Sequence, residues 1–185
     1  MTAGQPRPGP VWPCRHRPGE GTGSYEESAR RASHEELAVA RLLVGEGHHV
    51  RTVPEGRGGR SPDLLACGVS VEVKSFQALA ARDGRPPGPQ AVANKLLDAR
   101  GQGAVAILWA GRSGLTEAVA RDGFARFCQE AAVKGLGRSR AVRIVGDGFD
   151  LSLSPLLELA SGLGRGSPVP RAGPRATPRA RGVSL

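Results

Sequence analysis

Hydrophobic and polar positions alternate along residues 61–74, whose sequence is SPDLLACGVSVEVK. The pattern predicts two short β-strands joined by a two-residue turn at Cys67-Gly68, because glycine suits the positive φ that such turns require. Counting outward from this turn in an antiparallel pair places Asp63 directly opposite Glu72. Their Cβ atoms are then expected about 4.5–5.5 Å apart. Because strand side chains alternate between the two faces of a sheet, Lys74 shares the face of Glu72.

The predicted hairpin therefore has one apolar face and one charged face. Leu64, Val71 and Val73 form the apolar face. Like charges placed opposite each other destabilise a sheet, and a divalent cation bound between two carboxylates offsets that cost. Mg²⁺ is commonly held by one or two carboxylates together with water and substrate phosphate. The alternative is a solvent-exposed hairpin whose charged residues form a weak surface ion pair.

A helix is predicted to begin immediately after Ser33. Ser33 and Glu36 have the spacing of a capping box, and apolar residues then recur at helical intervals until Gly45 or Gly47 ends the run. Glu36 lies at the edge of the apolar stripe. Its carboxylate therefore either completes the capping box or points into a functional site. Glu35 lies on the neighbouring face, and the pattern does not decide which acid faces a site.

The rest of the ordered region alternates between strands and helices. Strands are predicted near 48–53, 103–109, 141–145 and 149–153, and helices near 90–100, 116–134 and 156–163, with Gly123 interrupting the middle helix. Ala91, Leu96 and Leu97 are expected to face the core, while Lys95 is free to face a site. The element order predicts an α/β fold, with helices packed on a mixed β-sheet.

Both ends of the chain lack hydrophobic periodicity. Residues 1–32 and 161–185 are rich in Pro, Gly and Arg, so we expect a disordered arm, a domain over 33–160 and a disordered basic tail. The chain has a formal net charge of +9, but the predicted domain contains sixteen basic and fourteen acidic residues. Basic tails favour polyanions through counterion release, although a coding bias towards Arg, Pro and Gly gives the same composition.

Cysteine content and hydropathy indicate the kind of compartment in which the protein acts. The three cysteines are odd in number and lack metal-ligand spacing, which favours a reducing compartment over a disulfide scaffold. No apolar run resembles a signal peptide or a membrane span. We therefore expect a cytoplasmic site of action and no membrane partner, with secretion by an unconventional or toxin-delivery route left open.

The order of the candidate residues resembles a known superfamily. Glu36 in a first helix, then Pro62-Asp63, then Glu72-Val73-Lys74 is similar to the motif of the PD-(D/E)XK nucleases, and the chain looks most like the tRNA-nuclease domains at the C-termini of contact-dependent growth inhibition toxins. The similarity covers roughly residues 33–153. It implies a restriction-endonuclease-like core and a metal-dependent phosphodiesterase. It also implies a cognate inhibitor protein as a partner.

The resemblance also suggests a role for each residue of the motif. Asp63, Glu72 and the backbone carbonyl of Val73 would bind Mg²⁺ or Mn²⁺, and Glu36 would bind the metal directly or through water. Lys74 would orient or deprotonate the attacking water, or neutralise the transition state. Further residues are candidates for binding or positioning the substrate: Arg57, Arg60, Gln77, Lys95 and Gln102.

Three functions remain open at this stage. The first is cleavage of a structured RNA, with tRNA as the candidate. The small net charge of the predicted domain favours it over duplex DNA, and the few aromatic residues disfavour a general single-strand nuclease. The second is the same chemistry on DNA, as in restriction or repair nucleases. The third is a nucleic-acid-binding protein without catalysis, against which the retained charged trio argues.

Overall fold

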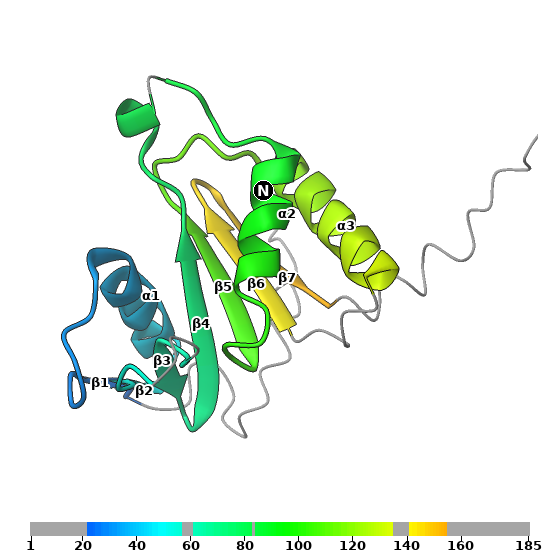
Figure 1. The fold of residues 1–185 in the computed structure, drawn as a ribbon. Coiled ribbons are helices and arrows are strands. Elements are labelled where there is room, and N and C mark those ends of the chain that lie inside the picture. Colours follow the sequence, from blue (N-terminus) through cyan, green and yellow to red (C-terminus); the bar gives the residue numbers. More distant parts are fainter. Residues whose placement is uncertain (1–21, 57–60, 83, 135–140, 155–185) are drawn as a thin grey trace, which may run out of the picture.

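The computed structural model describes residues 22–56, 61–82, 84–134 and 141–154 (Figure 1). Its strands and helices are β1 (Ser24–Glu26), α1 (His34–Gly45), β2 (His49–Thr52), β3 (Leu64–Ala66), β4 (Val69–Ser75), the 3-10 helix η1 (Leu79–Arg82), α2 (Pro89–Asp98), β5 (Val105–Ala110), α3 (Glu117–Val133), β6 (Ala141–Gly146) and β7 (Phe149–Leu153). The predicted α/β class with a mixed sheet is confirmed. The expected helix at 156–163 and the C-terminal tail lie outside the described residues.

Within the described residues the strands form one seven-stranded sheet in the order β1 to β7. The pairs β1–β2, β4–β5 and β5–β6 are parallel, while β2–β3, β3–β4 and β6–β7 are antiparallel. Helix α1 packs on one face of the sheet, and α2 and α3 pack together on the other (Figure 1). The fold is therefore a three-layer α/β/α sandwich.

Each face of the sheet has its own apolar core. The α1 side buries Val39 and Leu43 against Val71 and Ile107. The α2–α3 side buries Leu96 and Phe124, among others. Buried residues of α2 also include Val92 and Ala93, whereas the predicted Ala91 and Leu97 are only partly buried. Alternation along β5 sends successive side chains into the two cores, whereas β4 contributes Val71 and Val73 to the α1 side only.

The β3–β4 hairpin has the predicted turn, and the predicted register holds for residues 64–66 and 69–71. The predicted pairing of Asp63 with Glu72 was wrong, because the Asp63 N–H donates to the carbonyl of Val71. Leu64, Leu65 and Ala66 pair with Val71, Ser70 and Val69. Cys67 and Gly68 both have positive φ, at 48° and 82°, which is the backbone of a type I′ turn. Leu64, Ala66, Val71 and Val73 of the hairpin are buried in the α1 core. Local pattern and turn chemistry together thus determined the register of the pair.

Two predictions about the elements were wrong. Order does not begin at Ser33, because residues 24–26 form β1 in parallel with β2. Helix α3 runs through Gly123 without a break. A Cβ atom at Gly123 would lie 2.4 Å from Val92 Cβ, so this glycine permits the close approach of α2 and α3. The lack of a side chain at Gly123 allows α2 and α3 to pack closely, and α3 continues through this position.

A buried ion-pair cluster ties α1 to the far strands of the sheet. Arg143 of β6 is 3% exposed and donates to the carboxylates of Glu46, which caps α1, and Asp150 of β7. Burial disfavours the charged guanidinium, but the hydrogen bonds to these two acids outweigh it and raise the pKa of Arg143. The cluster braces the end of α1 against the sheet on the side opposite α2.

Candidate active site

A cavity of about 380 Å³ lies where the N-terminal segment, the start of α1 and the hairpin meet. It is open to solvent and bordered by the chain on both sides of the undescribed residues 57–60. The polar residues in its wall that concern the chemistry are Arg30, Glu36, Asp63, Glu72, Lys74 and Gln102. The structure therefore brings together four predicted catalytic side chains from three different elements of the fold.

Asp63 lies at the point where the hairpin ladder stops. Its N–H donates to the carbonyl of Val71 at 3.0 Å, one residue out of step with the pairs that follow it. The side chain turns back, and Oδ2 accepts a hydrogen bond from the Val73 N–H at 2.8 Å. Burial raises the pKa of Asp63 to about 6; the Val73 hydrogen bond opposes this shift, while the charges of Glu72 and Glu36 add to it.

Glu72 and Lys74 form a close pair on the opposite face of β4 from Val71 and Val73. Lys74 Nζ lies 2.6 Å from Glu72 Oε1, and the Glu72 side chain is 2% exposed. Glu72 Oε2 is buried and accepts no hydrogen bond from any residue that the structure describes. Burial raises the pKa of Glu72, although Lys74 opposes the shift. The predicted placement of this pair on one face is confirmed.

The loop before β5 passes very close to Glu72 at Gly103. A Cβ atom at Gly103 would lie 2.7 Å from the backbone nitrogen of Glu72 and 3.2 Å from its Cβ. Only glycine fits at this contact without a shift of β4. Gln102, the residue before it, lines the cavity and donates to the carbonyl of Asp98 at 2.7 Å.

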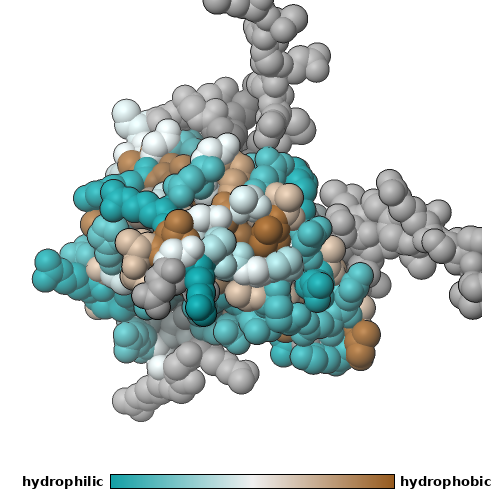
Figure 2. All heavy atoms as spheres, turned by 90° about the horizontal axis from the view of Figure 1, so that it is seen from above, coloured by the Kyte–Doolittle hydropathy of each residue, from teal (hydrophilic) through white to brown (hydrophobic). Residues whose placement is uncertain are grey.

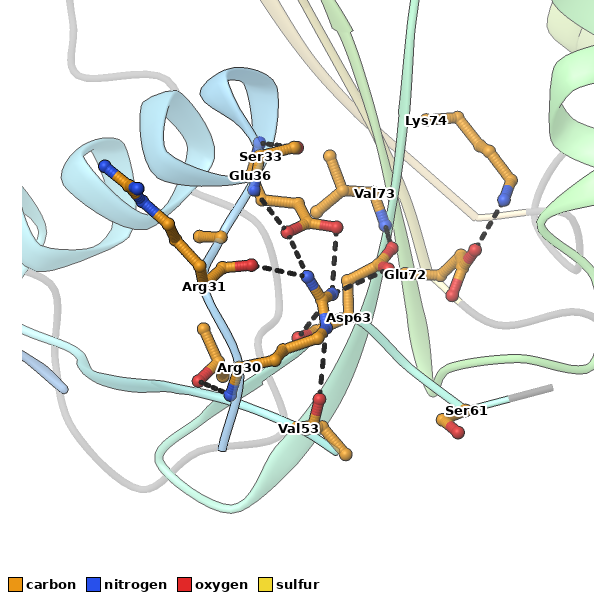
Figure 3. Close-up of polar contacts among 12 residues, drawn as sticks. Arg30, Arg31, Ser33, Glu36, Val53, Ser61, Asp63, Glu72, Val73 and Lys74 are labelled. Atoms are coloured by element: carbon orange, nitrogen blue, oxygen red, sulfur yellow. Dashed lines mark hydrogen bonds and ion pairs between the residues drawn. The ribbon is translucent and has the colours of Figure 1, made fainter. Parts of the chain in front are cut away.

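Glu36 belongs to the site through the capping box that the sequence predicts. Ser33 Oγ accepts from the Glu36 N–H, and Glu36 Oε2 accepts from the Ser33 N–H at 2.9 Å. Figure 3 shows its carboxylate directed at the guanidinium of Arg30, which lies between Glu36 and Asp63. Burial alone would raise the pKa of Glu36, but the hydrogen bonds from Arg30 and Ser33 lower it.

Arg30 uses its whole guanidinium group inside the protein. It pairs with both oxygens of Glu36 at 2.7 and 2.9 Å and reaches Asp63 Oδ1 at 3.2 Å. Its remaining donors reach the carbonyls of Val53 and Arg31. No sequence pattern indicates a role for this residue, because residues 22–32 have no periodicity. Arg30 acts as a positive charge that holds two acids of the site together.

Other predicted site residues lie elsewhere. Gln77 is exposed and Lys95 is partly exposed on α2, and neither borders the cavity. Arg57 and Arg60 fall outside the described residues. Glu35 borders a second cavity on the other side of the first turn of α1, so Glu36 is the acid that faces this site.

The carboxylates fit a hard divalent cation in part. One buried oxygen of Glu72 has no hydrogen-bond donor among the described residues, and the pKa of Asp63 is raised, so a nearby cation would stabilise the charged form of both carboxylates. No group of three or more His, Cys, Asp or Glu residues in the described parts of the chain is arranged to hold a metal ion. Two carboxylates suffice for Mg²⁺ when water and phosphate complete its shell. Glu36 is committed to Arg30 and is not free to be a direct ligand in this arrangement.

No protein-family model matches the sequence, and no curated protein matches it. Among solved structures, the fold is similar to a chain of the CdiA-CT/CdiI toxin and immunity complex from Burkholderia pseudomallei, with a TM-score of 0.42 and 18% sequence identity. The match covers 73% of this chain and 100% of the other. None of the helices that the structure describes is both long and apolar enough to cross a membrane.

Proposed function

We propose that this chain is a metal-dependent phosphodiesterase that cleaves structured RNA, with tRNA as the candidate substrate. The observation that carries the proposal is the convergence of Asp63, Glu72 and Lys74 on one open cavity, with a buried oxygen of Glu72 left without a hydrogen-bond donor. A purely structural ion pair would leave no such oxygen, because buried polar atoms are almost always satisfied.

Asp63 and Glu72 would hold Mg²⁺ or Mn²⁺ in this cavity, with the Val73 carbonyl as a further candidate ligand. The bound cation would supply Lewis-acid stabilisation of the phosphate and a more acidic water. Glu36 and Arg30 would fix the Asp63 carboxylate from the opposite side through the contacts described above. These residues therefore arrange a preorganised anionic pocket before any substrate arrives.

Lys74 would be the proton-handling or charge-neutralising group. Its ammonium lies 2.6 Å from Glu72 and its side chain is 24% exposed, so it borders both the carboxylate and the open part of the cavity. From this position it can hold the attacking water or donate to a phosphate oxygen as charge develops in the transition state. Gln102 is placed to position the substrate from the loop before β5.

The preference for RNA and the toxin-like role rest on the sequence. The domain predicted from the sequence carries sixteen basic against fourteen acidic residues, a small excess for a protein that grips duplex DNA. The motif resemblance to toxin tRNases favours a folded RNA, delivery into a target cell and a cognate inhibitor protein. Cleavage of DNA by the same residues is the second candidate function.

Incubation of the purified protein with tRNA and with duplex DNA, each with Mg²⁺ or with EDTA, tests the proposal. We expect tRNA to be cleaved only with Mg²⁺, and Glu72→Gln to remove the activity while leaving the fold intact by circular dichroism. Cleavage of duplex DNA with tRNA left whole would replace the substrate assignment. Binding of either nucleic acid without cleavage in Mg²⁺ or Mn²⁺ would refute the enzyme and leave a binding protein.

A further inference from the structure

A second cavity, of about 510 Å³, lies at the edge of the sheet where β4, β5 and β6 end. Its volume falls in the range of small-ligand sites, and in α/β folds ligands commonly bind beyond the carboxyl ends of parallel strands. The first turn of α1 separates it from the candidate active site, since Glu36 borders one cavity and Glu35 the other. Figure 2 looks down on this end of the molecule, where hydrophobic and hydrophilic patches adjoin.

The cavity has an aromatic wall. Trp109, at the end of β5, is partly exposed and borders the cavity, which the buried Phe76 also lines. A Cβ atom at Gly111 would come within 3.3 Å of the indole ring, so this glycine leaves room for the ring beside the backbone. A partly exposed indole beside an open cavity is a surface on which a planar base can stack.

Two arginines on the rim are free to bind a ligand. Arg41 and Arg112 are exposed, and neither guanidinium makes a hydrogen bond or ion pair with the described part of the chain. The backbone of Arg112, by contrast, is firmly held. It has a φ of 62°, its N–H donates to the Asp147 carboxylate at 2.8 Å, and its carbonyl accepts from the Leu79 N–H at 2.6 Å. Left-handed backbone at a non-glycine residue is a strain that often marks functional positions.

The acids in this cavity restrict the ligand further. Asp147 is engaged by the Arg112 N–H, whereas the Glu35 carboxylate makes no hydrogen bond or ion pair with another side chain that the structure describes. A simple anion would be repelled by these acids. A guanine nucleotide satisfies both charges, because its base edge presents adjacent N–H donors to a carboxylate while its phosphate suits arginine.

We propose that this cavity binds a guanine nucleotide, either free or as one unit of an RNA chain. The base stacks on Trp109, its N–H groups donate to Glu35, and its phosphate is held by Arg41 and Arg112. This assignment goes beyond the proposed phosphodiesterase and does not depend on it, because it uses no residue of the first cavity. If both are right, the second cavity reads a base near the cleaved bond.

Tryptophan fluorescence tests the proposal directly. The chain contains two tryptophans, so Trp12→Phe leaves Trp109 as the sole indole. In EDTA, where cleavage is suppressed, GMP should quench this signal at about tenfold lower concentration than AMP, because only guanine places two donors on Glu35. Ribose 5-phosphate should not quench. An RNA pentamer with one central guanine, compared with GMP, tells whether the nucleotide is taken within RNA or free.

Charge variants with a matched control complete the test. Arg41→Gln should weaken GMP binding about tenfold, and Glu35→Gln should remove the preference for GMP over AMP. Arg121→Gln, the same change at an exposed residue of α3, should leave binding unchanged. Absence of quenching by GMP, equal quenching by ribose 5-phosphate, or equal effects of Arg41→Gln and Arg121→Gln would each overturn the assignment. All of these outcomes are independent of nuclease activity.

Discussion

Replacing Arg30 with methionine removes the positive charge between two acids of the candidate active site while keeping a long side chain. In the structure the side chains of Arg30, Glu36 and Asp63 are 21%, 13% and 21% exposed. Exposed ion pairs contribute about 0–1 kcal/mol, and breaking a fully buried pair costs about 3–5 kcal/mol. This partly buried cluster lies between the two limits, so Arg30→Met should destabilise the protein by about 2–3 kcal/mol.

The loss should be visible by thermal unfolding in EDTA, as a decrease in Tm of about 8 °C. Arg31→Met is the matched control, because the neighbouring side chain is exposed and only its backbone carbonyl contacts Arg30. The pKa of Glu36 is lowered in the fold, so the contribution of the pair is fully present above the ordinary carboxyl pKa of about 4.3. It should disappear as pH falls below that value through the lowered pKa.

The same variant should bind metal more tightly. Without the guanidinium, Glu36 becomes available and the cavity gains one negative charge, so the Mn²⁺ affinity measured by titration calorimetry should increase about tenfold. Adding Glu36→Gln to Arg30→Met should remove this gain. Equal stability of Arg30→Met and Arg31→Met would refute the role of Arg30 in holding Glu36 and Asp63 together. Weaker metal binding by Arg30→Met would refute its action as a competing positive charge.

Three further results are expected. Because the pKa of Asp63 is about 6 in the fold, the free energy of unfolding of the metal-free protein should fall as pH rises from about 4 to 6. In urea titrations, Asp63→Asn should remove about 2–3 kcal/mol of that decrease. Gly103→Ala should push β4 away at Glu72, costing about 1–3 kcal/mol and most of the activity, whereas Gly45→Ala, with open space around it, should cost neither. Arg143→Met should lower stability by about 2 kcal/mol in denaturant titrations, since the two partner acids can still reach water.

The hairpin was predictable because its information is local. Alternation, a two-residue turn and a glycine with positive φ specify one register, and that register carries Glu72 and Lys74 to the same face. The capping box of α1 is equally local, and it placed Glu36 correctly. For these parts of the site, neighbouring residues in the sequence determine the geometry.

The features that the sequence did not reveal depend on contacts between residues that are far apart in the sequence. Arg30 has no local pattern, and its contacts come from α1, the hairpin and the chain after β2. The low helix propensity of glycine suggests that Gly123 breaks the helix. In the fold, α2 packs so closely against this position that only glycine fits. Lys95 has a suitable charge and helix position, yet α2 lies away from the cavity. Strand β1 is too short to show a period.

Single-turnover cleavage of tRNA by Lys74→Ala, at saturating Mg²⁺, tests the central claim most directly. Lys74 borders the cavity and pairs with Glu72 without being a metal ligand in the proposed site. We expect cleavage to slow by about 10²-fold. Mn²⁺ should still bind, at least as tightly as to the unmodified protein, because the cavity loses a positive charge beside Glu72. Lys134→Ala, at an exposed lysine after α3, should be as active as the unmodified protein. Full activity of Lys74→Ala would contradict the account and reduce the charged trio to a surface ion pair.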